Sequence, residues 1–428
     1  MYEIDRKLEQ RAAAGQPIQV GLVGAGQMGT EIITQVGEMV GMEIAVVVDL
    51  ALETAVKGYS YSKQKAEIVA TNAVAEATAA VAAGKAVATT NYRVATALPQ
   101  LDAVIDATGS TEMGAMVALD AFNHKKHVVM MSVECDITIG PILRQMAENA
   151  GVVYSLAAGD EPAATIELYR FAKALGFTIV AAGKGKNNPL NIYATPADVQ
   201  ANADARKMSA RMLCEFVDGS KTAIEMAAVS NATGLIPDLR GMHGAKATVQ
   251  TLKEVFCPQK DGGVLNQSGV IDFAIGVHPG VFLIVTTDNE RIKAGLAQRD
   301  MGPGPYYLLF RPYHLCSVEV PLTVAQAVFY HESSGHPLKT LVSECITVAK
   351  KDLRAGEILD GIGEYCYRGS IDRAAVARQE NLLPLGLAKG CVMKAAAPKD
   401  TVLTYNMVAI VNESVLLQLR RIQDKLYV

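Results

Sequence analysis

The sequence lacks the cysteine spacing of a disulfide framework or a zinc site. Its 428 residues include seven cysteines, an odd number, and none of them forms a CxxC pair. Dispersed cysteines of this kind predict free thiols in a reducing compartment. The metal-binding spacings HxxxH and HExxH are absent too, so a permanent zinc ion is not expected.

Long apolar runs and a strong charge of either sign are also missing. No apolar run approaches the roughly 20 residues that a membrane helix needs, and segment 1–16 has no apolar signal-peptide core. The formal net charge of −4 provides no basic surface for nucleic acid. We therefore expect a cytoplasmic protein that binds neither nucleic acid nor a membrane.

Two common catalytic motifs, GxSxG and the Walker sequence GxxxxGK[ST], do not occur either. Half of the residues are apolar and a fifth are charged, which is typical of a folded globular protein. Because 428 residues exceed the usual size of one hydrophobic core, we expect two or three domains.

A glycine-rich turn joins the first apolar run to a helical pattern. Gly24, Gly26 and Gly29 have the spacing GxGxxG. In this motif the first glycine permits the turn, the second lets the backbone approach a pyrophosphate, and the third lets the helix pack on the sheet. The helix start, which includes Gln27 and Met28, offers free N–H groups to the phosphates.

A second expected strand, 43–48, ends in Asp49. A carboxylate at this point suits a hydrogen bond to the ribose 2′-OH and would repel a 2′-phosphate, which favours NAD over NADP. The alternative is that Asp49 is only a turn residue at a strand end.

Strands and helices alternate through the first part of the chain, which predicts an α/β fold with a Rossmann-type, doubly wound parallel sheet. The expected elements include a helix at 63–83 and strands at 101–107, 127–133 and 152–156. Ligands bind at the carboxyl edge of such sheets. That edge should collect the glycine turn, Asp49, Thr108, Gly109, segment 132–134, Asp160 and Glu161.

Two further domains are expected. Residues 162–340 read as an α+β substrate domain with strands at 177–182 and 317–320 and one long helix at 195–216. Short strands with glycine turns then predict a small β-rich domain that ends in an amphipathic helix. The expected domains are a dinucleotide-binding domain with an N-terminal helix at 1–161, then 162–340 and 341–428.

Lys184 and Lys186 flank Gly185 in a loop expected after the strand 177–182. With Asn187 and Asn188 they suit an anionic substrate such as a phosphate or carboxylate. One lysine could also act as general acid toward a carbonyl oxygen. The alternative is a solvated surface turn.

Three acids are the other candidates. Asp160 and Glu161 form a pair that could bind a divalent metal or act as base, or could simply cap the helix after Pro162. Glu134, expected at a strand end, could face the nicotinamide.

Long blocks of the sequence resemble the 1-deoxy-D-xylulose 5-phosphate reductoisomerase-like proteins of the homoserine dehydrogenase superfamily. They are GLVGAGQMGTEI, DATG, VVMMSVECDITIGP, YSLAAGDEP, AGKGKNNPLN, NATGLIPD, GPYYLLFRPYHL and EVPLTVA. The later blocks AKKDLRAGEIL and LPLGLAKG are similar to an SAF (antifreeze-like) domain.

This resemblance implies isomerisation of a phosphorylated ketose and its reduction with NADPH to 2-C-methyl-D-erythritol 4-phosphate, an isoprenoid precursor. It implies dinucleotide binding at the three glycines and substrate binding at segment 184–188. Asp49 departs from the pattern expected of an NADPH user. An NAD-dependent dehydrogenase of another sugar acid or sugar phosphate in catabolism is therefore an alternative.

We thus expect an NAD(P)-dependent oxidoreductase that acts on CH–OH groups of a small anionic polyol or keto compound, working as a homo-oligomer. Lys184 or Lys186 would hold the anion, and one of the three acids would act as base or recruit Mg²⁺ or Mn²⁺. A non-catalytic dinucleotide-binding sensor is the alternative from another class. It would need the glycine turn but not the lysines.

Overall fold

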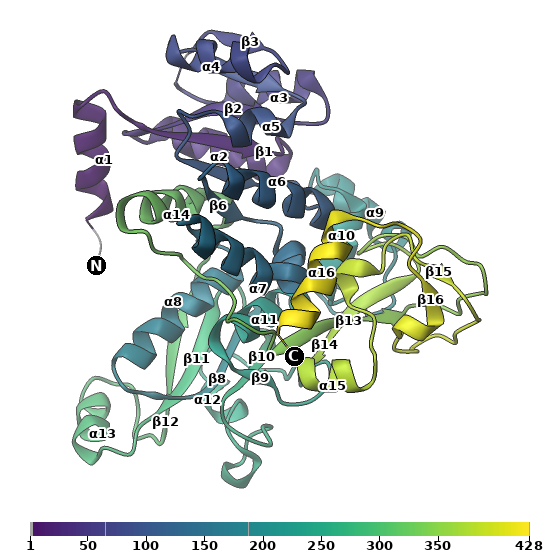
Figure 1. Cartoon of the computed structure of the whole chain (residues 1–428). Coiled ribbons are helices and arrows are strands. Elements are labelled where there is room, and N and C mark those ends of the chain that lie inside the picture. Colours follow the sequence, from purple (N-terminus) through teal and green to yellow (C-terminus); the bar gives the residue numbers. More distant parts are fainter. Residues whose placement is uncertain (1–2, 65, 187, 428) are drawn as a thin grey trace. The chain divides into compact units, whose positions relative to one another are not determined.

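The computed structural model describes residues 3–64, 66–186 and 188–427 (Figure 1). Its contacts divide the chain into two compact units. The first unit comprises Met1–Ala163, Leu315–Lys339 and Gln418–Val428, and the second comprises Ala164–His314 and Thr340–Leu417. The three expected domains stay a prediction. Among the described residues, no helix is long and apolar enough to cross a membrane.

The first unit contains a seven-stranded sheet in which every pairing is parallel, which confirms the expected Rossmann-type α/β fold. The spatial order is β3-β4-β2-β1-β5-β6-β7. The strands that directly follow β1 in the chain are added on one side of it, and the strands from β5 onward are added on the other side. Ligands bind at such a switch point. The strands are β1 (Ile18–Val23), β2 (Met42–Val48), β3 (Ile68–Ala70), β4 (Ala86–Thr89), β5 (Ala103–Asp106), β6 (His127–Met130) and β7 (Tyr154–Leu156).

The helices of this unit are α1 (Ile4–Ala13), α2 (Gln27–Glu38), α3 (Leu52–Gly58), α4 (Val74–Ala82), α5 (Tyr92–Ala97), α6 (Thr111–Asn123), α7 (Val133–Ala150) and α14 (Cys316–Tyr330). The expected helix at 63–83 is wrong, because its first half contains β3. The expected strand at 317–320 is also wrong, since it forms the start of α14. Val320 and Val324, four residues apart on one helix face, pack into the same core as Ile32 of α2.

The second unit is built on a five-stranded mixed sheet in the order β12-β11-β8-β10-β9. Its strands are β8 (Thr178–Lys186), β9 (Ile236–Pro237), β10 (Val270–Ile275), β11 (Val281–Thr286) and β12 (Tyr306–Arg311). Its helices include α9 (Pro196–Ala205), α10 (Ala210–Val217), α11 (Ser220–Thr233), α12 (Leu252–Val255) and α13 (Glu290–Ala297). The single helix expected at 195–216 is wrong, because Lys207 has a left-handed φ of 53° that ends α9.

The strands expected near the C-terminus are present as two-stranded sheets, β13 (Ser343–Ala349) with β14 (Tyr367–Arg373) and β15 (Val392–Met393) with β16 (Val408–Ala409). Helix α15 (Ala374–Gln379) packs beside them. Both β13 and β14 contact α11, so these strands share a unit with the five-stranded sheet. Helices α8 (Glu161–Ala174) and α16 (Val415–Leu426) each begin in one unit and end in the other.

Candidate functional site

Two of the three glycines in the first turn have the structural roles that the sequence predicted, and the role of Gly26 at a pyrophosphate stays a prediction. Gly24 has a φ of +99°, and a Cβ there would lie 2.6 Å from the Ala107 carbonyl oxygen. A Cβ on Gly29 would lie 2.0 Å from the Gly24 oxygen. Gly26 is exposed, and a Cβ there would meet nothing within 4 Å. The outer glycines are therefore required by packing, while the middle one leaves its backbone open to a ligand.

The start of α2 suits an anion. Gly26 is its N-cap residue and provides no side-chain cap, and the first turn contains no acid. Gln27 is exposed and Met28 is half-buried. The first N–H groups and the positive end of the helix dipole are thus available to a phosphate. These residues fit the dinucleotide that the sequence predicted.

Asp49 follows β2 and is tied to the glycine turn. Its Oδ2 accepts the N–H of Ala25 at 2.8 Å, and its Oδ1 accepts the N–H of Ala51 at 3.3 Å. Asp49 thus supports the turn, and its hydrogen bond to a ribose 2′-OH stays a prediction. The half-buried carboxylate also places negative charge beside the turn, and its remaining lone pairs can accept further hydrogen bonds.

The carboxyl end of β5 adjoins this turn. The Cβ position of Gly24 is 3.1 Å from the backbone nitrogen of Thr108, the residue before Gly109. The Gly109 N–H donates to Ser132 Oγ at 3.0 Å. The sheet therefore brings together the glycine turn, Thr108, Gly109 and Ser132, as expected. Sequence reasoning did not select Asp106, which binds both hydroxyls from the end of β5; its only signal was an acid that closes a buried strand.

Glu134 lies in the first turn of α7 and is buried. Its expected position at a strand end is wrong, because β6 stops at Met130 and the helix begins at Val133. An acid in a first helical turn interacts favourably with the helix dipole. A role for Glu134 at the nicotinamide stays a prediction.

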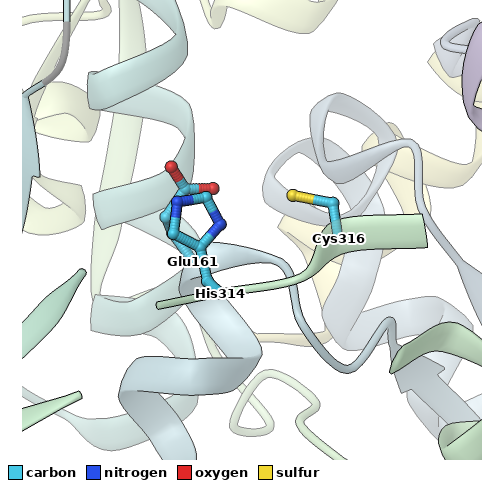
Figure 2. A group of neighbouring side chains, drawn as sticks. All are labelled: Glu161, His314 and Cys316. Carbon is cyan, nitrogen blue, oxygen red and sulfur yellow. The ribbon is translucent and has the colours of Figure 1, made fainter. Parts of the chain in front are cut away.

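Asp160 and Glu161 lie at the start of α8, where helix-capping residues occur. Cys316, the first residue of α14, has its Sγ 3.8 Å from Asp160 Oδ1, and the Glu161 carboxylate is within 4.8 Å of the same sulfur. Figure 2 shows Glu161 and Cys316 with His314, which lies in the loop that leads into α14. The next residue, Ser317, donates to Glu31 Oε2 at 2.8 Å, which ties α14 to α2.

Lys184 and Lys186 lie within β8 in the second unit, so the expected loop after residue 182 is wrong. Strand geometry alternates their side chains with Gly183 and Gly185. A Cβ on Gly185 would lie 1.7 Å from the Val277 oxygen, and one on Gly183 would lie 2.3 Å from the Asp272 oxygen. The glycines therefore allow close backbone approach on one face, while the lysines share the other. Asn187 lies outside the described residues, and Asn188 accepts a hydrogen bond from Arg206 at 3.1 Å.

Both lysines are buried, in contrast to a solvated turn. Lys184 forms an ion pair with Glu225 of α11. Lys186 Nζ donates to the backbone oxygen of Phe216 at 2.6 Å. Burial, helped by the charge of Lys184, lowers the pKa of Lys186 to about 8. Lys186 can therefore exchange a proton near neutral pH.

Another buried lysine of the second unit, Lys350, was not selected from the sequence. Lys350 Nζ binds Asp218 Oδ2 and the Ala194 oxygen, each at 2.8 Å, and both side chains of the ion pair are almost fully buried. Burial raises the pKa of Asp218, which the Lys350 charge opposes. Because the partners are far apart in sequence, no local pattern could have indicated this pair. Its paired charges are typical of a structural contact.

Comparison with known proteins finds a family match over part of the chain. Residues 159–320 match the family described as the catalytic domain of oxidoreductase DRL, a segment that includes Asp160, Glu161, Lys184 and Lys186. No protein of curated function matches the chain in sequence.

Several solved structures are similar to the chain at low identity. A probable dehydrogenase from Thermotoga maritima is 11% identical, covers 74% of this chain and 90% of its own, and has a TM-score of 0.40. An Agrobacterium radiobacter oxidoreductase in complex with NAD⁺, L-tartaric acid and magnesium is 12% identical, with coverages of 40% and 44% and a TM-score of 0.29. Lactobacillus casei myo-inositol dehydrogenase, in complex with NAD(H) and myo-inositol, is 15% identical, with coverages of 42% and 49% and a TM-score of 0.29.

At these identities and TM-scores the solved structures support no detail of substrate or mechanism. The family match supports oxidoreductase chemistry without extending to a reductoisomerase, an SAF domain or a role in isoprenoid synthesis. The family match supports the predicted oxidoreductase class, and the parallel sheet of the first unit is of the Rossmann type that the sequence predicted.

Proposed function

We propose that the protein is an NAD-dependent oxidoreductase that acts on a CH–OH group, or the corresponding carbonyl, of a small anionic polyol or keto compound. The observation that carries the choice of NAD is the contact between Asp49 Oδ2 and the Ala25 N–H. This contact holds a carboxylate against the phosphate-binding turn, where the 2′-phosphate of NADP would meet like charge.

The lysines of β8 provide the proton chemistry in this proposal. A bound nicotinamide supplies or accepts the hydride. Lys186, with its pKa of about 8, gives a proton to the carbonyl oxygen during reduction and removes one from the carbinol during oxidation. Glu225 offsets the charge of Lys184, so the pair of lysines attracts one anionic group rather than two.

The reductoisomerase prediction is kept as a second candidate because Asp160 and Glu161 lie together at the start of α8. Their carboxylates suit Mg²⁺ or Mn²⁺, which would orient a hydroxy-ketone and act as Lewis acid during its isomerisation. The thiol of Cys316 beside them is a soft ligand that Mg²⁺ does not prefer. The carboxylates alone would therefore hold the ion.

Titration of the purified protein with NADH and NADPH, followed by nicotinamide fluorescence, tests the proposal. We expect tighter binding of NADH. Tighter binding of NADPH would contradict the role of Asp49, and absence of binding to either would contradict the whole proposal.

A panel of sugar acids, sugar phosphates and keto acids, followed by nicotinamide absorbance with and without Mg²⁺ or Mn²⁺, then tests catalysis. Turnover of 1-deoxy-D-xylulose 5-phosphate that needs the metal would favour the reductoisomerase. Dinucleotide binding without turnover of any compound would favour the sensor. Size-exclusion chromatography tests the expected homo-oligomer.

A further inference from the structure

The carboxylate of Asp106 lies at the centre of a hydrogen-bond relay within the first unit. Its Oδ1 accepts the hydroxyl of Thr108 at 2.8 Å, and its Oδ2 accepts the hydroxyl of Ser132 at 2.5 Å. Each hydroxyl also accepts a backbone N–H, from Ser110 at 3.2 Å and Gly109 at 3.0 Å respectively. The relay thus connects one buried carboxylate to two consecutive amides of the turn after β5.

The ionised form of Asp106 determines how this relay is oriented. A carboxylate can only accept hydrogen bonds, so both hydroxyl protons must point toward it. The lone pairs of Thr108 and Ser132 are then available to the two backbone N–H groups. A protonated Asp106 would itself donate to one hydroxyl, and that hydroxyl proton would then be directed elsewhere.

The turn held by this relay forms part of the proposed cofactor site. A Cβ on Gly24 would lie 2.6 Å from the Ala107 oxygen and 3.1 Å from the Thr108 nitrogen, so this turn and the glycine turn are in direct contact. The two turns follow β5 and β1, the neighbouring strands between which the order of strand addition reverses. On the outer side the Cβ position of Gly109 is open, with no atom within 4 Å.

We propose that Asp106 is a positioning residue that sets the affinity for the dinucleotide by fixing the 108–110 turn through Ser132 and Thr108. Asp106 is fully buried, so in this proposal it acts through the two hydroxyls and not by contact with the ligand. The proposal rests on the proposed function, because it requires a dinucleotide at this edge of the sheet.

The proposal also implies a pH dependence of binding. Burial raises the pKa of Asp106 to about 6, against the effect of the two hydroxyl hydrogen bonds, and the charge of Glu134 raises it further. Cys135 and Tyr154 are the other titratable groups whose pKa values respond to its charge, and both are raised by burial, so they stay neutral near pH 6. NADH should therefore bind more weakly as the pH falls from 7 to 5.

The test measures the dissociation constant of NADH from pH 5 to 8 in the whole protein and in the variants Asp106→Asn and Ser132→Ala. We expect wild-type affinity to fall about tenfold from pH 7 to pH 5, as loss of a charged hydrogen-bond acceptor implies. Both variants should bind about tenfold more weakly at pH 7. Asp106→Asn should also lose most of the pH dependence.

Asp102→Asn is the matched control, because Asp102 also accepts a backbone N–H, that of Gln19 at 2.9 Å, but lies just before β5, at its amino end. It should bind NADH as the wild type does. Wild-type affinity and pH dependence in a folded Asp106→Asn would overturn the proposal. If Asp106→Asn does not fold, unchanged binding by Ser132→Ala would overturn it equally. A wild type that binds no dinucleotide would instead overturn the proposed function itself.

Discussion

Lys184 and Glu225 form an ion pair buried between β8 and α11. The exposed fractions of their side chains are 7% and 1%, so neither charge is well hydrated. Buried ion pairs often stabilise a fold little, but removal of one partner leaves the other charge in a medium of low polarity. A structural role for Lys184 therefore predicts that removal of the lysine alone destabilises the fold much more than removal of both partners.

The first prediction is that Lys184→Met lowers the free energy of unfolding by roughly 3 kcal/mol, because Glu225 keeps its charge and loses its cationic partner. The double variant Lys184→Met/Glu225→Met should recover most of this loss. Urea denaturation measures all three proteins. If the double variant is as unstable as the single one, the pair does not act as an isolated charge couple.

The second prediction concerns Lys186. Its pKa of about 8 implies that carbonyl reduction, which needs the protonated amine, declines as the pH rises above 8, whereas carbinol oxidation increases over the same range. Lys186→Met should lower kcat/KM by about 10²-fold or more. The measurement is kcat/KM against pH in both directions.

Lys260→Met, in a short exposed helical turn, is the control for Lys186→Met. Its pH profile should match the wild type. An unchanged profile in Lys186→Met would remove Lys186 from the reaction.

Sequence alone located the glycine turn because its signals are local. The bounds of β1 and the separate roles of Gly24, Gly26 and Gly29 follow from a strand, a turn and a helix within about a dozen residues. The contact of this turn with residues 107 and 108 followed from the rule that parallel strands end at one edge.

The errors come from contacts between distant segments. The alternation of glycine and lysine in segment 183–186 resembles a loop, and only the backbone oxygens of Asp272 and Val277 explain why a strand needs the glycines. The β-branched residues at the start of α14 are typical of a strand, and only their packing into the core beside α2 explains why they form a helix. Asp106 could not be chosen without Ser132, which is 26 residues away.

The third prediction separates the two roles of Asp49. Asp49→Asn keeps an oxygen that can accept the Ala25 N–H but removes the charge, so it should bind NADPH more tightly while the turn stays intact. Asp49→Ala removes both and should weaken NADH and NADPH alike. Fluorescence titration measures both variants. Leu50→Ala, at the neighbouring position with 93% exposure, is the control. Unchanged preference in Asp49→Asn would show that its charge does not select the cofactor.

The fourth prediction is a loss of stability in mild acid. Burial lowers the pKa of His127 to about 4, and the charge of His331, whose ring centroid is 4.9 Å from that of His127, adds to this effect. Because the folded protein disfavours the charged ring, stability is complete above the unfolded pKa of about 6.5 and is lost as the pH falls toward 4. The free energy of unfolding falls by at most about 3 kcal/mol, and by less than this because the ring is partly exposed to solvent.

His127→Asn tests this prediction, because its amide oxygen can replace Nδ1 as acceptor of the Val153 N–H. Urea denaturation from pH 7 to 4 should show a flatter dependence in this variant. The exposed His124 provides the control His124→Asn, which should keep the wild-type slope. Equal slopes in all three proteins would assign the acid sensitivity to other groups.

The fifth prediction concerns Gln423 of α16, whose side-chain amide bridges a gap in α7. Pro141 interrupts that helix because it has no N–H. Gln423 Oε1 accepts the Ile142 N–H at 3.2 Å, and its Nε2 donates to the Thr138 oxygen at 3.1 Å, so one buried amide bridges an N–H and a carbonyl on the two sides of the proline.

Gln423→Ala should therefore lower the free energy of unfolding by on the order of 1–3 kcal/mol, since the Ile142 N–H loses a buried partner, while the Thr138 oxygen keeps Arg420 Nη1 at 3.3 Å. It should also speed hydrogen exchange of the Ile142 amide relative to the middle of β1. Ile422→Ala, at the neighbouring position with 46% exposure, controls for a change in α16 itself and should cost much less. If the two variants are equally stable and Ile142 exchanges at the wild-type rate, Gln423 does not support the proline break, and α7 tolerates Pro141 without help from the C-terminal helix.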